Sequence, residues 1–285
     1  MHKKESKSGK IFLIFNRITF HYLGMLFCFY CAIHPIKACK LWAVSSKAGP
    51  LSSISSSELQ EIDIQLTSFF HQSESMMDGW SLLGYSGLTS DSLTLLKRSN
   101  ITARQDSALY WSTVEVLLND SVTGIALGHL RLASSGANAI PNPHPWIFYM
   151  NGKPFSLIHN GTVNKNILYN LLTNNGNDLS WLDSYPPQTF GGGDWKENGW
   201  GNVIDSELIL LFMMQHYNIS GGDLVTGLQS SLSKLINEGV SASQLNFIFS
   251  DISLIPGCNN ISVSCFFISI PLLLKIWFIK IVFFF

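Results

Sequence analysis

Charged side chains are scarce in this sequence. Of its 285 residues, 13% are Asp, Glu, Lys or Arg, and the formal net charge at pH 7 is -1. A protein that binds nucleic acid presents clustered basic residues to the phosphate backbone, and the composition has no surplus of them. We therefore expect no nucleic acid partner. The hydrophobic fraction of 46% is enough for one large core.

Cysteine is also scarce, and its placement excludes a disulfide framework. Four of the five cysteines lie in apolar segments near the two ends, Cys28 and Cys31 at one end and Cys258 and Cys265 at the other. Small domains held by disulfides have their cysteines spread through the fold. Cys39 alone lies beside the middle of the chain, so this thiol is a candidate for chemistry.

The residues before Cys39 have the layout of a secretory signal peptide. A region with five Lys and Arg residues (1–21) precedes an uncharged apolar block (22–33), and the small residue Ala38 ends the stretch HPIKA. The block is shorter than the ~20 residues that span a bilayer, which favours removal over anchoring. We expect a signal peptide over 1–38 and a secreted or extracytoplasmic protein. Membrane tethering and a lipoprotein signal, which would acylate the cysteine, stay open.

The last segment, 252–285, departs in composition from the middle of the chain. It is apolar, and Pro271, Lys275 and Lys280 interrupt it. Its charge-free part is short for a membrane span, so the tail offers a membrane contact rather than a regular span. A misread gene end is the other interpretation, and we assign the segment no function.

Between these ends, hydrophobic periodicity predicts helices that flank strands. Ser55 and Glu58 form a capping-box pattern at the start of a helix over 55–70. Further helices are expected at 108–118, 205–217 and 223–238, and strands at 121–134, 145–150, 154–160 and 245–251, with a hairpin turn at 151–153. Helices that flank strand pairs predict an α+β layered domain and not a βαβ repeat.

Four short signals remain, and each has an ordinary structural explanation by itself. They are Cys39, GHLRLASSG at 128–136, HNG at 159–161 (with NPHP before it) and IDSE at 204–207. An Asn-Gly pair usually forms a turn, and an Asp that opens a helix usually caps it. Their order and spacing, together with QSESMMDGWSL at 72–82, are what distinguish them.

In this order the signals resemble the class II glutamine amidotransferase domain, an N-terminal-nucleophile family, and the DGW segment is similar to its stand-alone branch. The resemblance covers residues 39 to about 251. It implies a four-layer αββα sandwich of antiparallel sheets, and a secreted amidohydrolase that cleaves glutamine or a γ-glutamyl-type amide through a thioester, with no cofactor and no metal. The family usually has Thr where Ser134 stands and Gly where Ser81 stands; we expect Ser81 to alter a turn near the pocket.

The chemistry of amide hydrolysis accounts for the catalytic candidates. An amide carbon is a poor electrophile, so its hydrolysis needs a strong nucleophile, a proton shuttle and donors aimed at the oxyanion. Cys39 at a mature N-terminus would supply a thiol and an α-amine that titrates near about pH 8. The Asn160-Gly161 pair would supply the oxyanion donors.

The resemblance also implies how the substrate is held. It makes Arg131, Ser134 and Asp205 substrate-binding residues, with Arg131 on the α-carboxylate, where a planar guanidinium fits two oxygens. Asp205 would pair with the α-ammonium. The expected partner is thus a small γ-glutamyl or glutamine-like substrate.

Two competing site interpretations have little support. The three histidines His129, His144 and His159 recur at even spacing, but no pair has the short spacing of metal ligands, so structural roles are expected. FGGGDW at 190–195 lacks the Lys-Ser/Thr of a phosphate loop and is expected to shape the pocket mouth.

Two other functions stay open. The protein would be a glutaminase subunit that passes ammonia to a separate synthase, or a non-catalytic binding module that retains the fold. Because only the apolar tail follows Asp251, we expect no ammonia acceptor site in this chain, which favours hydrolysis.

Overall fold

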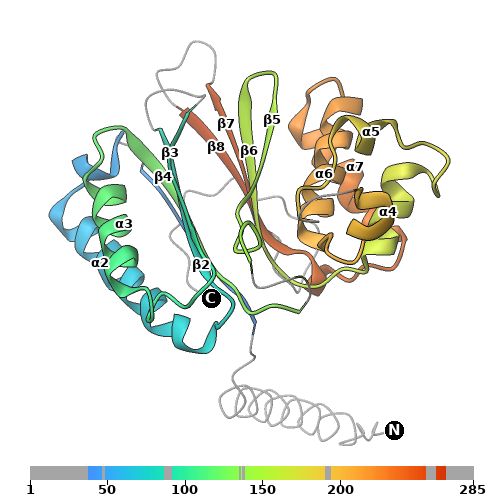
Figure 1. Ribbon diagram of the computed structural model, residues 1–285. Coiled ribbons are helices and arrows are strands. Elements are labelled where there is room, and N and C mark those ends of the chain that lie inside the picture. The colour runs from blue at the N-terminus through green and yellow to red at the C-terminus, as the bar shows by residue number, and fades with distance from the viewer. Residues whose placement is uncertain are drawn as a thin grey trace, which may run out of the picture. The chain divides into compact units, whose positions relative to one another are not determined.

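The structure of this protein is a computed structural model that describes residues 38–46, 49–86, 92–134, 136, 139–189, 194–254 and 261–267. These residues form a mixed α+β structure with two antiparallel sheets and helices (Figure 1). The strands are β1 (Lys40–Ser45), β2 (Trp80–Ser86), β3 (Leu93–Ser99), β4 (Thr123–Leu130), β5 (Trp146–Met150), β6 (Lys153–Asn160), β7 (Asn246–Leu254) and β8 (Ile261–Phe267). The α-helices are α2 (Ser56–Gln72), α3 (Ser107–Asn119), α4 (Lys165–Thr173), α5 (Ser180–Ser184), α6 (Asp205–Ile219) and α7 (Leu224–Asn237). The predicted α+β class is therefore confirmed.

The first sheet has the strand order β1-β4-β2-β3, and all its neighbouring strands are antiparallel. Leu130, the last residue of β4, is paired with Lys40 of β1 and with Trp80 of β2. The residues just before β1 and β2 therefore lie beside the residues just after β4. This register brings Cys39 and the DGW segment together at the same end of the strands of this sheet.

Helices α2 and α3 pack against the first sheet (Figure 1). The predicted capping box of α2 is present, because the Glu58 amide donates to Ser55 Oγ and the Ser55 amide donates to Glu58 Oε2. The helix then buries Ile62, Leu66 and Phe69 at helical spacing. This apolar stripe faces strand residues of β1, β2 and β4 in a common core.

The second sheet has the order β5-β6-β7-β8, again antiparallel throughout. Its core is shared with α4 to α7. Helix α6 is apolar on nearly all sides and is buried accordingly, as expected for a helix that packs against both a sheet and other helices. In its first turn, Ser206 accepts a hydrogen bond from the Trp146 indole at 3.1 Å, which fixes α6 against β5.

A third apolar cluster joins the two sheets. It contains residues of β2, β4, β6 and β7: Leu83, Tyr85, Ile125, Leu127, Ile158 and Ile248. The strands that contribute them are buried on both faces, since their outer faces carry the helices. Burial on both faces explains why β2, whose seven residues are all buried, has no alternating polar pattern.

The hairpin turn predicted between β5 and β6 is confirmed. Asn151 and Gly152 both have positive φ, 52° and 77°, which is the conformation that a two-residue hairpin turn requires. The expectation for Ser81 is wrong, because this residue lies inside β2 and not in a turn. Its buried hydroxyl donates to the His144 carbonyl, so it is a packing contact that a glycine could not make.

The tail that the sequence leaves without a function contributes part of the second sheet. Strand β7 continues to Leu254, and residues 261–267 form β8, which pairs with it in an antiparallel register. The remaining tail and the predicted signal peptide up to residue 37 lie outside the described residues. No helix within the described ranges combines the length and the apolar character needed to cross a membrane.

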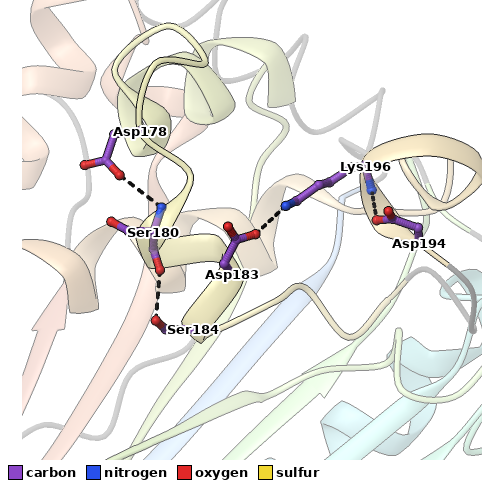
Figure 2. A network of polar contacts seen from close by, with 6 residues as sticks. All are labelled: Asp178, Ser180, Asp183, Ser184, Asp194 and Lys196. Atoms are coloured by element: carbon purple, nitrogen blue, oxygen red, sulfur yellow. Dashed lines mark hydrogen bonds and ion pairs between the residues drawn. The ribbon is translucent and has the colours of Figure 1, made fainter.

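A polar network on the surface connects α5 with the π-helical turn Trp195–Gly199 (Figure 2). Lys196 forms an ion pair with Asp183, and its backbone amide donates to the Asp194 carboxylate at 2.9 Å. Both members of the ion pair are substantially exposed, so the pair is expected to orient the turn rather than to stabilise the fold.

Candidate functional site

Cys39 lies immediately before β1, where its thiol contacts the backbone of Leu132. The Leu132 amide donates to Sγ at 3.3 Å, and Sγ lies 3.4 Å from the Leu132 carbonyl oxygen. Burial raises the pKa of the Cys39 thiol above its ordinary value. The Leu132 amide and the Arg131 charge oppose this increase, whereas the Asp78 charge adds to it. In this environment the thiol is held close to donors but is kept mainly protonated.

The DGW segment supports the residues that follow β4. The Arg131 amide donates to the Gly79 carbonyl at 2.8 Å, and the Asp78 amide donates to the Arg131 carbonyl at 3.1 Å. The Asp78 carboxylate also accepts from the Ala133 amide at 2.7 Å. Gly79 has φ 113°, and a Cβ there would overlap the Ser99 carbonyl, so this position requires glycine. Asp78 of the DGW segment is therefore a candidate site residue, although it was not among the site residues predicted from the sequence.

The Arg131 side chain is 3% exposed, and its guanidinium lies near the start of α6. A Cβ on Gly136 would be 3.5 Å from Arg131 Nη2 and 2.8 Å from Ile204, the residue before α6. Burial lowers the pKa of Arg131, and the nearby Asp78 carboxylate opposes that decrease. Arg131 thus brings a positive charge inward, between the end of β4 and α6.

Asn160 ends β6, and Gly161 packs closely against the turn before β7. A Cβ on Gly161 would overlap the Gln244 carbonyl oxygen and lie 2.7 Å from His159 Nε2. The same Gln244 carbonyl accepts from His159 Nε2 at 2.8 Å, and the Gln244 side chain donates to the Thr162 carbonyl at 2.7 Å. Among the described residues, none hydrogen-bonds the half-buried Asn160 side chain.

Asp205 is the first residue of α6, but its side chain does not cap the helix. One of its oxygens, Oδ2, accepts from the Val163 amide at 2.7 Å and so connects α6 to the segment after Asn160. Ser134 also contacts this segment, because its hydroxyl lies 2.7 Å from the hydroxyl of Thr162. Two of the three predicted substrate-binding residues, Ser134 and Asp205, therefore contact the segment that begins at Gly161.

Taken together, these contacts join the predicted site residues through three short segments. Cys39 contacts the 131–134 segment, that segment contacts 160–163, and 160–163 contacts Asp205. These hydrogen bonds join residues that are 28, 42 and 93 positions apart in the sequence. Distant segments of the chain therefore meet at one location. The arrangement combines a thiol, a buried cation and a buried carboxylate.

The three histidines His129, His144 and His159 are all buried. The rings of His129 and His144 stack with centroids 3.9 Å apart. His144 Nε2 lies 3.1 Å from both the amide nitrogen and the carbonyl oxygen of His159, and its Nδ1 lies 3.2 Å from the Asn142 carbonyl. A proton on Nδ1 lets the ring donate to Asn142 and accept from the His159 amide. Burial lowers the pKa of all three histidines, to about 3 for His144. In the part of the chain that is described, no three His, Cys, Asp or Glu side chains are grouped so as to hold a metal ion.

Sequence comparison adds little to this geometry. No family model matches this chain. An uncharacterized protein of Methanocaldococcus jannaschii is 25% identical to it over 105 residues, which are 36% of this chain and 26% of that protein. The chain therefore spans about a quarter of the length of that relative. The functional argument accordingly depends on the residues of the site.

Proposed function

We propose that the protein is an N-terminal-cysteine amidohydrolase that cleaves glutamine or a γ-glutamyl-type amide after removal of the residues before Cys39. The observation that carries this proposal is the position of the thiol. It lies against the Leu132 amide, one residue beyond Arg131, in a segment that is hydrogen-bonded to the one that follows Asn160-Gly161. Nucleophile, carboxylate binder and oxyanion donors would then converge on one substrate.

We further propose that the fold is the four-layer αββα sandwich of N-terminal-nucleophile hydrolases. The three core clusters support this idea. One lies between α2, α3 and the first sheet, one between the two sheets, and one between the second sheet and the helices α4 to α7. In such a sandwich the nucleophile would stand at the start of a strand, and β1 begins directly after Cys39.

The proposed reaction has two steps. In the first, the Cys39 sulfur attacks the substrate carboxamide carbon, and the Asn160 side chain and the Gly161 amide donate to the oxyanion. The carbon–nitrogen bond breaks, the nitrogen leaves as ammonia or an amine with a proton from the α-ammonium of Cys39, and a thioester remains. In the second, water attacks the thioester, the carboxylate is released and the thiol regains its proton.

Processing would provide the base. While residue 38 is attached, the Cys39 nitrogen is an amide and burial raises the pKa of the thiol. Cleavage converts this nitrogen into an α-amine, which titrates near about pH 8 and carries a proton at neutral pH. A positive charge next to the sulfur favours the thiolate and would lower the pKa of the thiol. The uncut chain should therefore be the less reactive form.

The charges of the site match a γ-glutamyl substrate. The buried guanidinium of Arg131 suits the α-carboxylate, for which a planar fork gives two hydrogen bonds. Asp205 uses Oδ2 for the Val163 amide, which leaves Oδ1 for an α-ammonium. Ser134, linked to Thr162, would complete the contacts to the substrate.

The decisive experiment reads the N-terminus of the protein from its native host and then measures amide hydrolysis. We expect a mature chain that begins at Cys39 and releases ammonia or an amine from glutamine or from a panel of γ-glutamyl amides. Cys39→Ala should abolish release without changing the melting temperature, because the side chain is only half buried. Ser45→Ala, at the exposed end of β1, is the matched control and should keep full activity.

Two results would contradict the proposal. If mature protein still carries residues before Cys39, or if its α-amine is acylated, the base is absent. If Cys39→Ala retains the activity of the Ser45→Ala control, the thiol is not the nucleophile. A folded, processed protein that binds γ-glutamyl compounds without cleaving them would instead favour the binding module.

A further inference from the structure

A cavity lies where the edge strands of the two sheets meet α6. Its volume is about 520 Å³, within the range of small-molecule sites. Strands β3 and β5, helix α6 and the segment after α5 all contribute to its wall. None of the six predicted catalytic and substrate-binding residues lines it, so it is a different site from the one around Cys39.

The cavity contains a cation, Arg98, that has no acidic partner among the described residues. One amino group of the guanidinium, Nη2, donates to the Pro145 carbonyl at 2.5 Å. Its Nε is buried, and no described residue accepts a hydrogen bond from it. Burial lowers the pKa of Arg98, and no neighbouring charge opposes the decrease. The partly desolvated guanidinium of Arg98 therefore has no counter-ion among the described residues, which is energetically unfavourable.

The carboxylate of Glu207 lines the same cavity but is engaged elsewhere. Its Oε1 accepts from the Gln188 amide at 2.6 Å, and its Oε2 accepts from the amide and the hydroxyl of Thr189 at 3.2 and 2.7 Å. Three donors thus compensate the charge of Glu207 within the protein. It fixes the loop to α6 and leaves Arg98 without a partner.

The remaining walls are largely aromatic. Trp146, Phe148 and Tyr185 line the interior, and the rings of Phe148 and Tyr185 have centroids 4.9 Å apart. Tyr149, which is 58% exposed, stands at the rim. Flat apolar walls with a single cation suit a ligand that has an apolar body and one anionic group.

We propose that this cavity binds an organic carboxylate with an aromatic or aliphatic body. The carboxylate pairs with the guanidinium of Arg98, and the body packs on the rings of Trp146, Phe148 and Tyr185. The pairing supplies the counter-ion that Arg98 lacks within the described residues. The site requires neither the thiol of Cys39 nor its processing, so it stands or falls separately from the amidohydrolase proposal.

Titration calorimetry with three acids and their amides tests this proposal. The probes are phenylacetate, indole-3-acetate and octanoate, each beside its neutral carboxamide of nearly the same shape. At least one acid is expected to bind the full-length protein about tenfold or more tightly than its amide. Arg98→Met should remove this preference, and Lys97→Met, the neighbouring cation on β3, should keep it.

Two further variants separate binding from folding. Arg98→Lys keeps the charge but loses the planar fork, and is expected to bind the acid with intermediate affinity. Tyr149→Ala, at the exposed rim, should weaken acid and amide by the same factor. The proposal is overturned if every acid binds no better than its amide, if Arg98→Met and Lys97→Met bind the acid equally, or if no acid binds up to about 5 mM.

Discussion

An Asn-Gly pair lies at each end of strand β6, and the two positions require glycine for different physical reasons. Asn151-Gly152 has positive φ at both residues and forms the hairpin turn from β5. Gly161 has no such φ, but a Cβ there would overlap the Gln244 carbonyl. The first pair needs glycine for backbone conformation and the second for close packing.

The surroundings of the two pairs differ as well. A Cβ on Gly152 would have no atom within 4 Å, and Asn151 is exposed. Asn160 is half buried, and the residues after it contact both Ser134 and Asp205. The same dipeptide is therefore a solvent-exposed turn at one end of the strand and part of the candidate site at the other.

Replacing each of these glycines with alanine should give the largest difference in stability between the two ends of β6. Gly161→Ala forces a backbone carbonyl to move, which no rotamer change can avoid, and we expect a loss of about 3 kcal/mol in the free energy of unfolding. Gly152→Ala keeps its space but adopts an unfavourable φ, at a cost of about 1 kcal/mol. Urea denaturation of both variants measures the difference.

The two glycine variants should also differ in the ammonia-release assay. Gly161→Ala should lose activity under conditions in which it is still folded, whereas Gly152→Ala should keep it. Equal losses of stability in both variants would show that the tight contact with Gln244 is relieved by a small shift, and the contrast between the two pairs would disappear.

A second contrast concerns the asparagines. If Asn160 donates to the oxyanion, Asn160→Ala should lower kcat about 100-fold, or about 3 kcal/mol of barrier, with a smaller change in KM. Asn151→Ala should leave both constants unchanged, because that residue lies at the exposed hairpin. An Asn160→Ala enzyme with unchanged kcat would exclude this side chain from the oxyanion site.

Much of this fold could be predicted from the sequence because its elements carry local signals. The helix α2 has its capping box and a stripe of apolar residues, and the turn at Asn151-Gly152 has the dipeptide that its backbone requires. Strands β2 and β3 were not predicted. Every residue of β2 is buried, Ser81 and Ser86 included, so its sequence WSLLGYS has no regular alternation of apolar and polar residues.

The candidate site was harder to predict, because the residues that position it are distant in the sequence. Asp78 holds the backbone of Ala133, and Gln244 lies on Gly161, contacts that no local pattern encodes. Cys39 was singled out by its position after the predicted signal peptide, and Arg131 and the other predicted residues were found through a family resemblance and its order of motifs. The geometry brings their segments together, but their chemical roles stay predictions.

A third contrast concerns the titratable side chains near the two ends of β6, His144 beside Asn160 and Lys153 at the hairpin. The ring of His144 accepts from the His159 amide, next to Asn160, and its pKa is lowered to about 3 from 6.5. A histidine with a lower pKa in the folded state binds fewer protons there than in the unfolded chain. Its contribution is complete above about pH 6.5 and is lost as the pH falls towards 3.

We therefore expect a stability loss on acidification that depends on this ring. Between about pH 7 and pH 5, His144 should account for about 2 kcal/mol, and His144→Gln should show a correspondingly flatter dependence. Melting temperatures across this pH range measure it, with Lys153→Gln at the hairpin end as a control that keeps the wild-type slope. Parallel curves for wild type and His144→Gln would contradict the assignment.

The smallest expected effect is on the thiol alone. The Asp78 charge raises the pKa of Cys39, so Asp78→Asn should lower it and shift the pH profile of thiol alkylation to lower pH. Arg131→Gln should shift the profile the opposite way, since the Arg131 charge lowers the pKa of the same thiol. Lys153→Gln, a charge change at the other end of β6, should leave the profile in place. Iodoacetamide labelling of Cys39, followed by mass spectrometry, distinguishes these outcomes, and identical profiles in Asp78→Asn and Arg131→Gln would mean that neither charge acts on the sulfur.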